Sequence, residues 1–448
     1  MPARNTPASA DRTRPPDRDQ ECYVYVQLPG TTEVVTCGRY QQRQSRTGAV
    51  TGVFVYGRRY LERTDAVALD PIHLPFTPRT VETAKLGGIF GALRDASPDT
   101  WGRRVIEHAL HRAELSEVEY LLHSPEDRAG ALSFGRSPTP PSPLWSYNRI
   151  VQLPELFEAA RLLQDDASSP RLAAELQHAA LVLKEPGTSM GGARPKSVVQ
   201  DDDGLWLAKF PSRDDRWTNA TVEAGLLALA QRCEIRTPPT RIERIGAAQV
   251  LLVRRFDRER LVHDTRDTPR YVRHRMVSAL TVLDADDSAN ARAQWSYAVL
   301  ADELRRWSIQ SRADRHELFR RMVFNALVSN LDDHPRNHAL IAPPRGWQLA
   351  PAYDITPEPR PGQHERDLAM IGGRFGRRAS RGNLASQAKR FDFTEAEAHA
   401  VIDRLVDIVR GEWEGVLRAH GATAADCATV ASAFVDEGFE YPVPENFV

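Results

Sequence analysis

Short apolar runs separated by glycines dominate the first part of the hydrophobic pattern. Residues 23–26 and 53–56 consist mainly of aromatic and β-branched residues, the types that favour strands. Residues 1–20 carry prolines and scattered charges but few large apolar groups, a composition typical of disorder. The pattern therefore predicts a disordered arm over residues 1–20 and a β-rich subdomain over residues 21–110.

Residues 111–255 mix helical and strand-like patterns. Apolar positions recur at helical spacing over residues 156–163 and again over residues 222–230, which predicts two amphipathic helices. Between them, two strand-like runs flank Asp203-Gly204. This Asp-Gly pair predicts a hairpin, because glycine adopts a positive φ at little steric cost. We expect this region to form the N-lobe of the molecule.

The remaining residues, 256–448, have a mainly helical pattern. Apolar side chains follow helical spacing over residues 318–323 and over residues 401–408. This region should form a helical C-lobe. The succession of a β-rich subdomain, a mixed lobe and a helical lobe predicts an α+β, two-lobed fold.

Composition excludes several classes of protein. The 448 residues carry a formal net charge of -1, which gives no sign of a nucleic-acid coat or a membrane-surface binder. The four cysteines include no C-x-x-C pair, so a reducing compartment fits best. There is no apolar run of about 18 residues and no signal-peptide core. We expect a cytoplasmic protein that has no membrane partner.

A polar loop follows the predicted helix that ends near Asn330. Asp332 and Asn337 have the spacing D-x-x-x-x-N of kinase catalytic loops, in which the aspartate accepts the proton of the substrate hydroxyl and the asparagine binds Mg²⁺. Asp333 is the alternative base, since only the spacing favours Asp332. A simpler interpretation is that these polar residues merely end a helix.

Three further residues complete a kinase-like set. Lys209 lies in a predicted strand, and Glu223 in the next predicted helix is its candidate ion-pair partner. Asp354 follows another strand-like run and can hold Mg²⁺ with Asn337, because Mg²⁺ takes one or two carboxylates beside phosphate oxygens. Each residue alone has an ordinary explanation as a solvated strand or turn residue. Their order along the chain favours an ATP- and Mg²⁺-dependent phosphoryl-transfer site.

A glycine-containing loop over residues 187–192 precedes the strand of Lys209. The backbone N–H groups of Gly191 and Gly192 can approach phosphate oxygens closely. The loop does not match the Walker A motif, and a lone Gly-Gly pair is more often a plain turn.

Several motifs along the chain resemble those of the HipA family of serine/threonine kinases. They are Gly192-Ala193-Arg194-Pro195-Lys196 with Lys209-Phe210-Pro211, Asp333-His334 to Asn337, Leu349-Ala350-Pro351-Ala352-Tyr353-Asp354, Arg255-Phe256-Asp257 and Asp99-Thr100-Trp101-Gly102-Arg103. The resemblance covers nearly all of the chain after the arm. It implies a protein-kinase-like fold that uses ATP and Mg²⁺.

The resemblance also implies roles for single residues. Asp332 would be the catalytic base, and Asn337 and Asp354 would hold Mg²⁺. Ser189 would be autophosphorylated, which inactivates the kinase. Arg336 stands where a lysine is frequent in the family. The residues implied at the nucleotide are Gly191, Gly192, Ala193, Arg194, Lys196, Lys209, Glu223, Arg254, Phe256, His334, Arg336 and Tyr353.

Membership in this family would imply partners as well. Its kinases phosphorylate translation components such as aminoacyl-tRNA synthetases and so arrest growth. A small HipB-like helix-turn-helix antitoxin would bind the chain and connect it indirectly to DNA. The residues leave three alternatives open: a catalytically silent corepressor, a small-molecule kinase, and a metal-dependent hydrolase built on Asp332, Asp333, His334 and His338.

Overall fold

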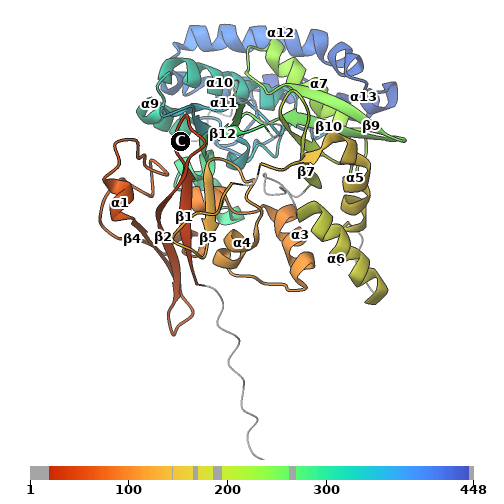
Figure 1. The fold of residues 1–448 in the computed structure, drawn as a ribbon. Coiled ribbons are helices and arrows are strands. Elements are labelled where there is room, and N and C mark those ends of the chain that lie inside the picture. Colours follow the sequence, from red (N-terminus) through yellow and green to blue (C-terminus); the bar gives the residue numbers. More distant parts are fainter. Residues whose placement is uncertain (1–19, 144, 165–169, 185–193, 262–268, 443–448) are drawn as a thin grey trace, which may run out of the picture.

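The computed structural model describes residues 20–442 with the exception of residues 144, 165–169, 185–193 and 262–268. Nearly all of the predicted arm lies outside the described residues, as do Ser189, Gly191, Gly192 and Ala193. The described part forms a β-rich subdomain, a second sheet with its helices, and a helical lobe (Figure 1).

The first sheet belongs to the N-terminal part of the chain. Its strands are all antiparallel, in the order β4-β3-β2-β1-β5. β5 comes from beyond residue 110, so the sheet crosses the boundary that the sequence pattern placed there. The strands are β1 (Glu21–Gln27), β2 (Val34–Gln44), β3 (Val50–Tyr56), β4 (Val81–Thr83) and β5 (Leu132–Gly135). The helices of this part are α1 (Arg58–Leu61), η1 (Lys85–Gly87), α2 (Gly91–Asp95), α3 (Thr100–Leu110) and α4 (Glu117–His123).

The second sheet has the order β6-β7-β8-β10-β9. The hairpin predicted around Asp203-Gly204 is confirmed: β7 and β8 pair antiparallel, and Gly204 has a φ of 144°. The strands are β6 (Asn148–Arg149), β7 (Lys196–Gln200), β8 (Leu205–Lys209), β9 (Thr240–Ile245) and β10 (Ala248–Arg254). The helices are η2 (Ile150–Gln152), α5 (Leu153–Leu162), α6 (Pro170–Lys184) and α7 (Asn219–Arg232).

The C-terminal lobe contains two small sheets besides its helices. The strands are β11 (Arg258–Arg260) with β12 (Tyr271–Arg273), and β13 (Arg275–Ser278) with β14 (Ala339–Ala342) and β15 (Gln348–Leu349). The helices are α8 (Ala279–Val282), η3 (Ala289–Gln294), α9 (Tyr297–Trp307), α10 (Ser311–Leu327), η4 (Pro335–Asn337), α11 (Arg381–Ala385), η5 (Ala388–Phe391), α12 (Glu395–Ala419), α13 (Ala424–Val430), η6 (Ala431–Ala433) and η7 (Glu437–Glu440).

Helix α7 joins the second sheet to the helical lobe. Its apolar residues, Val222 and Leu226 among them, belong to the same buried core as those of α10 and α12. Figure 1 shows α7 directly beneath the long helix α12. Gly225 permits this packing, because a Cβ atom there would lie 2.9 Å from the Leu417 Cα atom. A side chain that projects from α7 toward the second sheet is therefore positioned by the packing of α7 against both lobes.

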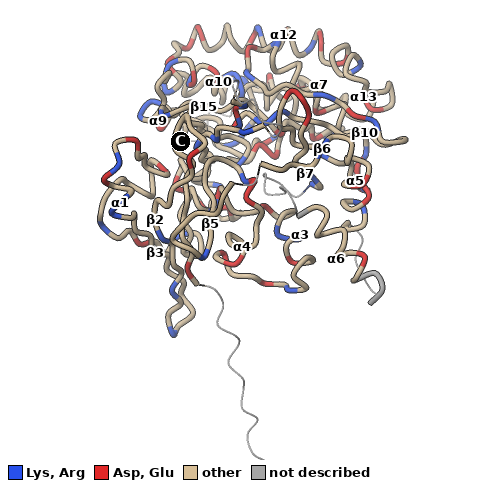
Figure 2. The backbone as a smooth tube through the Cα atoms, in the orientation of Figure 1, with Lys and Arg blue, Asp and Glu red and all other residues tan. Residues whose placement is uncertain are grey.

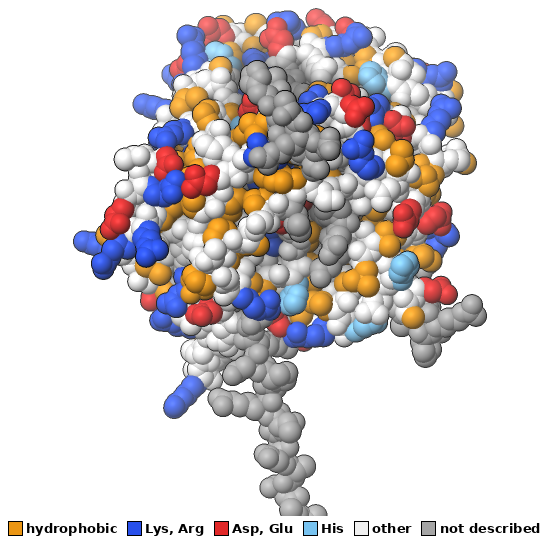
Figure 3. Space-filling model, in the orientation of Figure 1, with side chains coloured by type: hydrophobic (Ala, Val, Ile, Leu, Met, Phe, Trp, Pro, Cys, Tyr) orange, Lys and Arg blue, Asp and Glu red, His pale blue; other side chains and the backbone are white. Residues whose placement is uncertain are grey.

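Charge is mixed over the molecule. Figure 2 shows acidic and basic residues throughout the described part of the chain, and Figure 3 shows both signs interspersed over one face. Among the described residues, no helix is long and apolar enough to cross a membrane. This surface fits the near-zero net charge of the sequence.

Candidate active site

Three charged side chains from separate elements meet at the end of β8. Lys209 donates a hydrogen bond of 2.6 Å from Nζ to Glu223 Oε1 on α7, and one of 2.8 Å to Asp354 Oδ1. Strand alternation explains the direction of Lys209, because Ala208 and Phe210 on either side are buried in the core beneath the sheet. The ion pair that the sequence indicated between Lys209 and Glu223 is thus present, and Asp354 joins it.

The opposite charges of Lys209 and Asp354 stabilise each other. Burial by itself lowers the pKa of Lys209, but the carboxylates of Asp354 and Glu223 outweigh burial and raise it. Burial raises the pKa of Asp354, and the charge of Lys209 more than reverses that effect, so this pKa is lowered. Lys209 therefore stays cationic and Asp354 anionic near neutral pH, as phosphate and metal binding require.

The backbone of Asp354 is also unusual. Its φ is 59°, in the left-handed region, where asparagine and aspartate are more frequent than other residues with side chains. Such conformations persist where the surrounding structure holds them, often at functional sites. The turn aims the Asp354 carboxylate back toward Lys209.

The loop after α10 places the two neighbouring aspartates, Asp332 and Asp333, in different environments. Asp332 is exposed and lines the cleft that Lys209 also lines. Asp333 is buried, with its Oδ1 atom 2.9 Å from His338 Nε2. Asn337 donates from Nδ2 to the backbone oxygen of Asp332 at 3.2 Å, so the carbonyl oxygen of its side chain remains the group for a cation. Geometry thus favours Asp332 over Asp333 as the residue open to a substrate.

The environment of Asp332 suits a proton acceptor. Partial removal from water raises the pKa of its carboxyl; the nearby His334 lowers it, and the negative charges of Asp354 and Glu358 raise it further. The net effect is a raised pKa. A more basic carboxylate accepts a hydroxyl proton more readily.

These groups line one cleft of about 290 Å³. Phe256 and Tyr353 form an aromatic pair there, with ring centroids 5.7 Å apart. Tyr353 also donates from its hydroxyl to the backbone oxygen of Arg336 at 2.7 Å. The predicted residues that line the cleft are Lys209, Arg254, Phe256, Asp332, His334, Arg336, Asn337, Tyr353 and Asp354.

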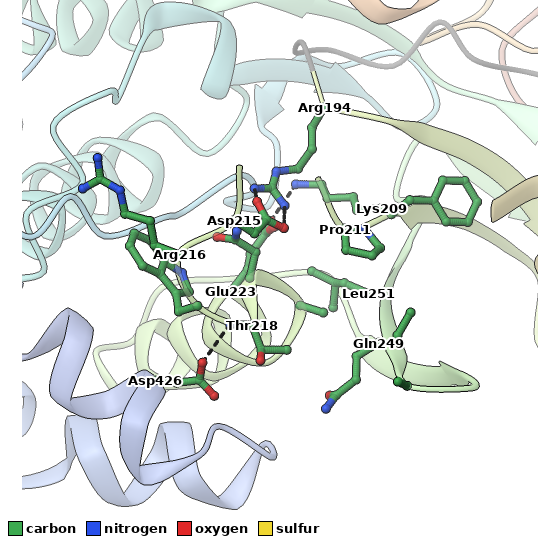
Figure 4. Close-up of a pocket in the computed structure, with 16 residues that line it drawn as sticks. Arg194, Lys209, Pro211, Asp215, Arg216, Thr218, Glu223, Gln249, Leu251 and Asp426 are labelled. Carbon is green, nitrogen blue, oxygen red and sulfur yellow. Dashed lines mark hydrogen bonds and ion pairs between the residues drawn. The ribbon is translucent and has the colours of Figure 1, made fainter. Parts of the chain in front are cut away.

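Among the described residues, three that were predicted at the nucleotide do not line this cleft: Arg194, Lys196 and Glu223. Lys196 is buried in β7, where Nζ is 2.7 Å from Asp99 Oδ2. Arg194 donates to Asp215 at 3.2 Å in a neighbouring pocket of about 340 Å³, which Lys209 and Glu223 also line (Figure 4). The structure therefore does not place Arg194 or Lys196 in the cleft of Asp332.

The sequence assigned no role in the site to four cleft residues from the N-terminal part of the chain: Asp95, Ser97, Asp99 and Ala129. Only Asp99 had been singled out, as part of a motif, and it caps α3 by accepting a hydrogen bond from the Gly102 N–H group at 2.7 Å. No local pattern could have shown that these residues line the same cleft as Asp332 and Asn337, because their approach depends on how the N-terminal subdomain packs against the rest of the chain.

Asp287 was missed as well. Its Oδ2 atom accepts a hydrogen bond of 2.6 Å from Arg336 Nε, and its Oδ1 atom lies 2.9 Å from His334 Nε2. Burial raises the pKa of Asp287, but the hydrogen bond from His334 and the charge of Arg336 outweigh burial and lower it to about 2.

The donor set determines which metals fit. Within the described residues, no group of three or more His, Cys, Asp or Glu side chains could hold a metal ion. The hydrolase alternative needs His334 and His338 together, but His338 faces Asp333 and His334 faces Asp287. Mg²⁺ needs fewer protein ligands, since substrate and water oxygens complete its coordination shell. The carboxylate of Asp354 and the amide oxygen of Asn337, which line the same cleft, fit that requirement.

A strand lysine paired with a helix glutamate, above a loop that carries Asp332 and Asn337, is a two-lobed kinase-like arrangement. The HipA-like C-terminal domain model matches residues 188–413, and the HipA N-terminal domain model matches residues 38–135. The chain belongs to the HipA family, and its α+β, two-lobed fold is the predicted one.

One of the similar solved structures supports this fold. HipA of the Shewanella oneidensis MR-1 toxin–antitoxin system, in complex with HipB and operator DNA, is similar with a TM-score of 0.63 at 15% identity, over 94% of this chain and 100% of that one. The Helicobacter pylori proinflammatory kinase CtkA matches with a TM-score of 0.34 at 12% identity, over 55% of this chain and 91% of that one. No curated protein sequence matches this chain.

Proposed function

We propose that this chain transfers the γ-phosphate of ATP to a serine or threonine hydroxyl of a protein. The observation that supports this function best is the meeting of Lys209, Glu223 and Asp354 in the cleft region where Asp332 and Asn337 lie. These residues come from a strand, a helix and two loops of different lobes, and a purely structural role for all of them together would be unusual.

Each residue has a physical task in this reaction. Asp332 accepts the proton of the attacking hydroxyl, helped by its raised pKa. Lys209, which Glu223 holds in place, neutralises phosphate charge. Asn337 and Asp354 would hold Mg²⁺, which when bound supplies positive charge to the phosphate oxygens.

The side chains in the wall of the cleft are suited to bind the planar adenine base beside the phosphates. Phe256 and Tyr353 present two neighbouring aromatic rings, and Arg254 lies at the edge of the cleft. Aromatic and apolar surfaces bind planar ligands by stacking and desolvation. We therefore place the adenine beside Phe256 and Arg254. Arg194 and Lys196 do not line this cleft, and Gly191, Gly192 and Ala193 of the glycine loop lie outside the described residues.

Family membership supports a toxin role. The similar Shewanella protein was solved with HipB and operator DNA. We propose that a HipB-like helix-turn-helix antitoxin binds this chain and connects it to DNA. We further propose that the phosphorylated target is a translation component, such as an aminoacyl-tRNA synthetase, and that phosphorylation of Ser189 silences the enzyme.

The test is mass spectrometry of purified protein after incubation with MgCl₂ and ATP, beside an Asp332→Ala variant. We expect phosphate on the wild-type chain, at Ser189 or a nearby hydroxyl, and none on the variant. Calorimetry with Mg-ATP accompanies it. ATP binding without phosphate transfer would favour the silent corepressor instead, and phosphate on a metabolite alone would favour a small-molecule kinase. Absence of both binding and transfer would contradict the kinase function.

A further inference from the structure

A short segment connects the N-terminal subdomain with the catalytic loop. We call residues 278–287 the bridge segment; it begins at the end of β13, includes α8 and ends at Asp287. One end is bonded to residues of the first 95 positions of the chain. The other end is bonded to the loop that carries Asp332 and Asn337.

Asp95 is the main anchor at the N-terminal side. Its carboxylate accepts three hydrogen bonds of 2.7 Å each, from Ser278 N, Ser278 Oγ and Thr281 Oγ1. Arg94 beside it donates to Thr281 Oγ1 at 3.2 Å and to the Ala285 backbone oxygen at 3.3 Å. Bonds to a charged acceptor are stronger than neutral ones, so the start of the bridge segment is held firmly.

Asp284 supplies a second anchor. His73 Nε2 lies 2.8 Å from Asp284 Oδ1, and Lys85 pairs with the same carboxylate. The packing between these parts is also tight, since a Cβ atom at Gly91 would come within 2.3 Å of Thr281 Cγ2. A shift of the bridge segment would therefore break these contacts with the N-terminal subdomain.

At the other end, Asp287 contacts two of the residues between Asp332 and Asn337. Both of its carboxylate oxygens are engaged, one by Arg336 and one by His334. Trp295, shortly after the bridge segment, places its ring 4.1 Å from the His334 ring, centroid to centroid. His334 is therefore enclosed between an aspartate and an aromatic ring.

His334 in turn shapes the catalytic loop. Its Nδ1 atom accepts a hydrogen bond of 3.1 Å from the Arg336 N–H group, and its backbone oxygen accepts one of 2.7 Å from the Asn337 N–H group. The orientation of the imidazole decides whether the first of these bonds forms. Asp287 sets that orientation through the opposite ring nitrogen.

We propose that Asp287 is a positioning residue for the catalytic loop. The bridge segment connects the N-terminal subdomain to this loop, so the position of the subdomain determines the positions of Asp332 and Asn337. The inference rests on the proposed kinase function for its catalytic consequence. Its structural part, that Asp287 holds the loop, stands independently. The N-terminal subdomain then belongs to the catalytic unit and is more than a docking module.

The test compares full-length Asp287→Ala and Asp287→Asn with Asp286→Ala. Asp286 is the matched control, because it is a neighbouring exposed carboxylate that accepts a hydrogen bond of 2.6 Å from the Asp287 N–H group and, within the described part of the chain, bonds to no residue of the loop. Two quantities are measured for each protein: hydrogen exchange of peptides that cover residues 330–338, and steady-state kcat and KM for ATP in Mg²⁺-dependent phosphate transfer.

We expect faster exchange of the loop in Asp287→Ala than in Asp286→Ala. We also expect a fall in kcat of about 10- to 100-fold, the effect of a displacement of roughly 1 Å at a reacting group. The KM for ATP should change much less, because Lys209 and Arg254 are held by the second sheet. Asp287→Asn keeps the shape and one acceptor, so it should retain part of the wild-type kcat.

Equal exchange in Asp287→Ala and Asp286→Ala would overturn the proposal. Faster exchange with an unchanged kcat would overturn its catalytic part. If the wild-type chain neither binds nor uses ATP, the kinase function fails, and the exchange comparison still decides whether Asp287 holds the loop. If Asp287→Ala does not fold, the comparison of loop exchange between Asp287→Asn and Asp286→Ala decides in the same way whether Asp287 holds the loop.

Discussion

At the scale of single residues, Asp332 and Asp333 show how neighbours in sequence acquire different tasks. Asp332 keeps contact with solvent in the cleft, whereas Asp333 is buried beside His338. A carboxylate at the surface of a cleft is free to receive a proton. A buried carboxylate needs its partner, because an unpaired buried charge is costly.

This difference predicts opposite behaviour of the two variants. Asp332→Asn should lower kcat about 100- to 10,000-fold, the usual contribution of a general base, and leave the free energy of unfolding nearly unchanged. Asp333→Ala should lower the free energy of unfolding by about 1–3 kcal/mol, because the buried His338 ring loses the carboxylate beside it. Urea denaturation and phosphate-transfer rates measure the two effects. A stable but inactive Asp333→Ala, beside an active Asp332→Asn, would reverse the assignment of the base.

At the scale of elements, helix α7 carries Glu223 and is positioned by its contact with α12. Gly225, two residues further along α7, faces Leu417 at a distance that leaves no room for a side chain. Glycine is a poor helix former, so its presence here is explained by the close approach of the two helices. The ion pair of Glu223 with Lys209 therefore depends on packing on the opposite side of α7.

Two glycine-to-alanine variants test this contact. Gly225→Ala gains up to about 1 kcal/mol of helix propensity but should destabilise the protein by about 1–2 kcal/mol net, because overpacking costs about 1–3 kcal/mol. Gly415→Ala in α12 is the control. Nothing lies within 4 Å of a Cβ atom there, so a gain of about 0.5–1 kcal/mol is expected. Thermal or urea unfolding measures both, and a stabilised Gly225→Ala would show that α7 and α12 separate easily.

At the scale of the whole molecule, buried ion pairs connect the N-terminal subdomain with the kinase-like lobes. Arg255, just after β10, donates to Asp127 at 2.5 Å, and Asp257 accepts a hydrogen bond of 2.9 Å from the Gly130 N–H group. His73 adds the link to Asp284 in the bridge segment. Together these contacts attach the N-terminal subdomain to the rest of the protein.

The link through His73 predicts a pH dependence of stability. Burial lowers the pKa of His73, but the carboxylates of Asp70 and Asp284 outweigh burial and raise it above the ordinary 6.5. A raised pKa means that this stabilisation is fully present below about pH 6.5 and is lost as the pH rises through the higher folded-state value. The difference in Tm between wild type and His73→Gln should therefore be larger at about pH 5.5 than at about pH 8.5.

The charged groups that face His73 are Asp70 and Asp284, with Lys85 on the far side of Asp284. The pKa of Asp284 is lowered, since Lys85 and His73 outweigh its burial, so it stays ionised throughout this range. Differential scanning calorimetry of both proteins at the two pH values provides the measurement. A Tm difference that does not vary with pH would show that His73 is held in its neutral form.

The sequence by itself determined the order of the elements, and it predicted the residues that we propose for phosphoryl transfer. Strand alternation placed Lys209, and loop spacing selected Asp332 and Asn337, because these patterns depend on neighbours within a few positions. Only the tertiary structure decided that β5 completes the first sheet, that Lys196 pairs with Asp99, and that Asp287 contacts Arg336. Those contacts join residues tens of positions apart, and their energy comes from packing and charge pairing that exist only after the chain has folded.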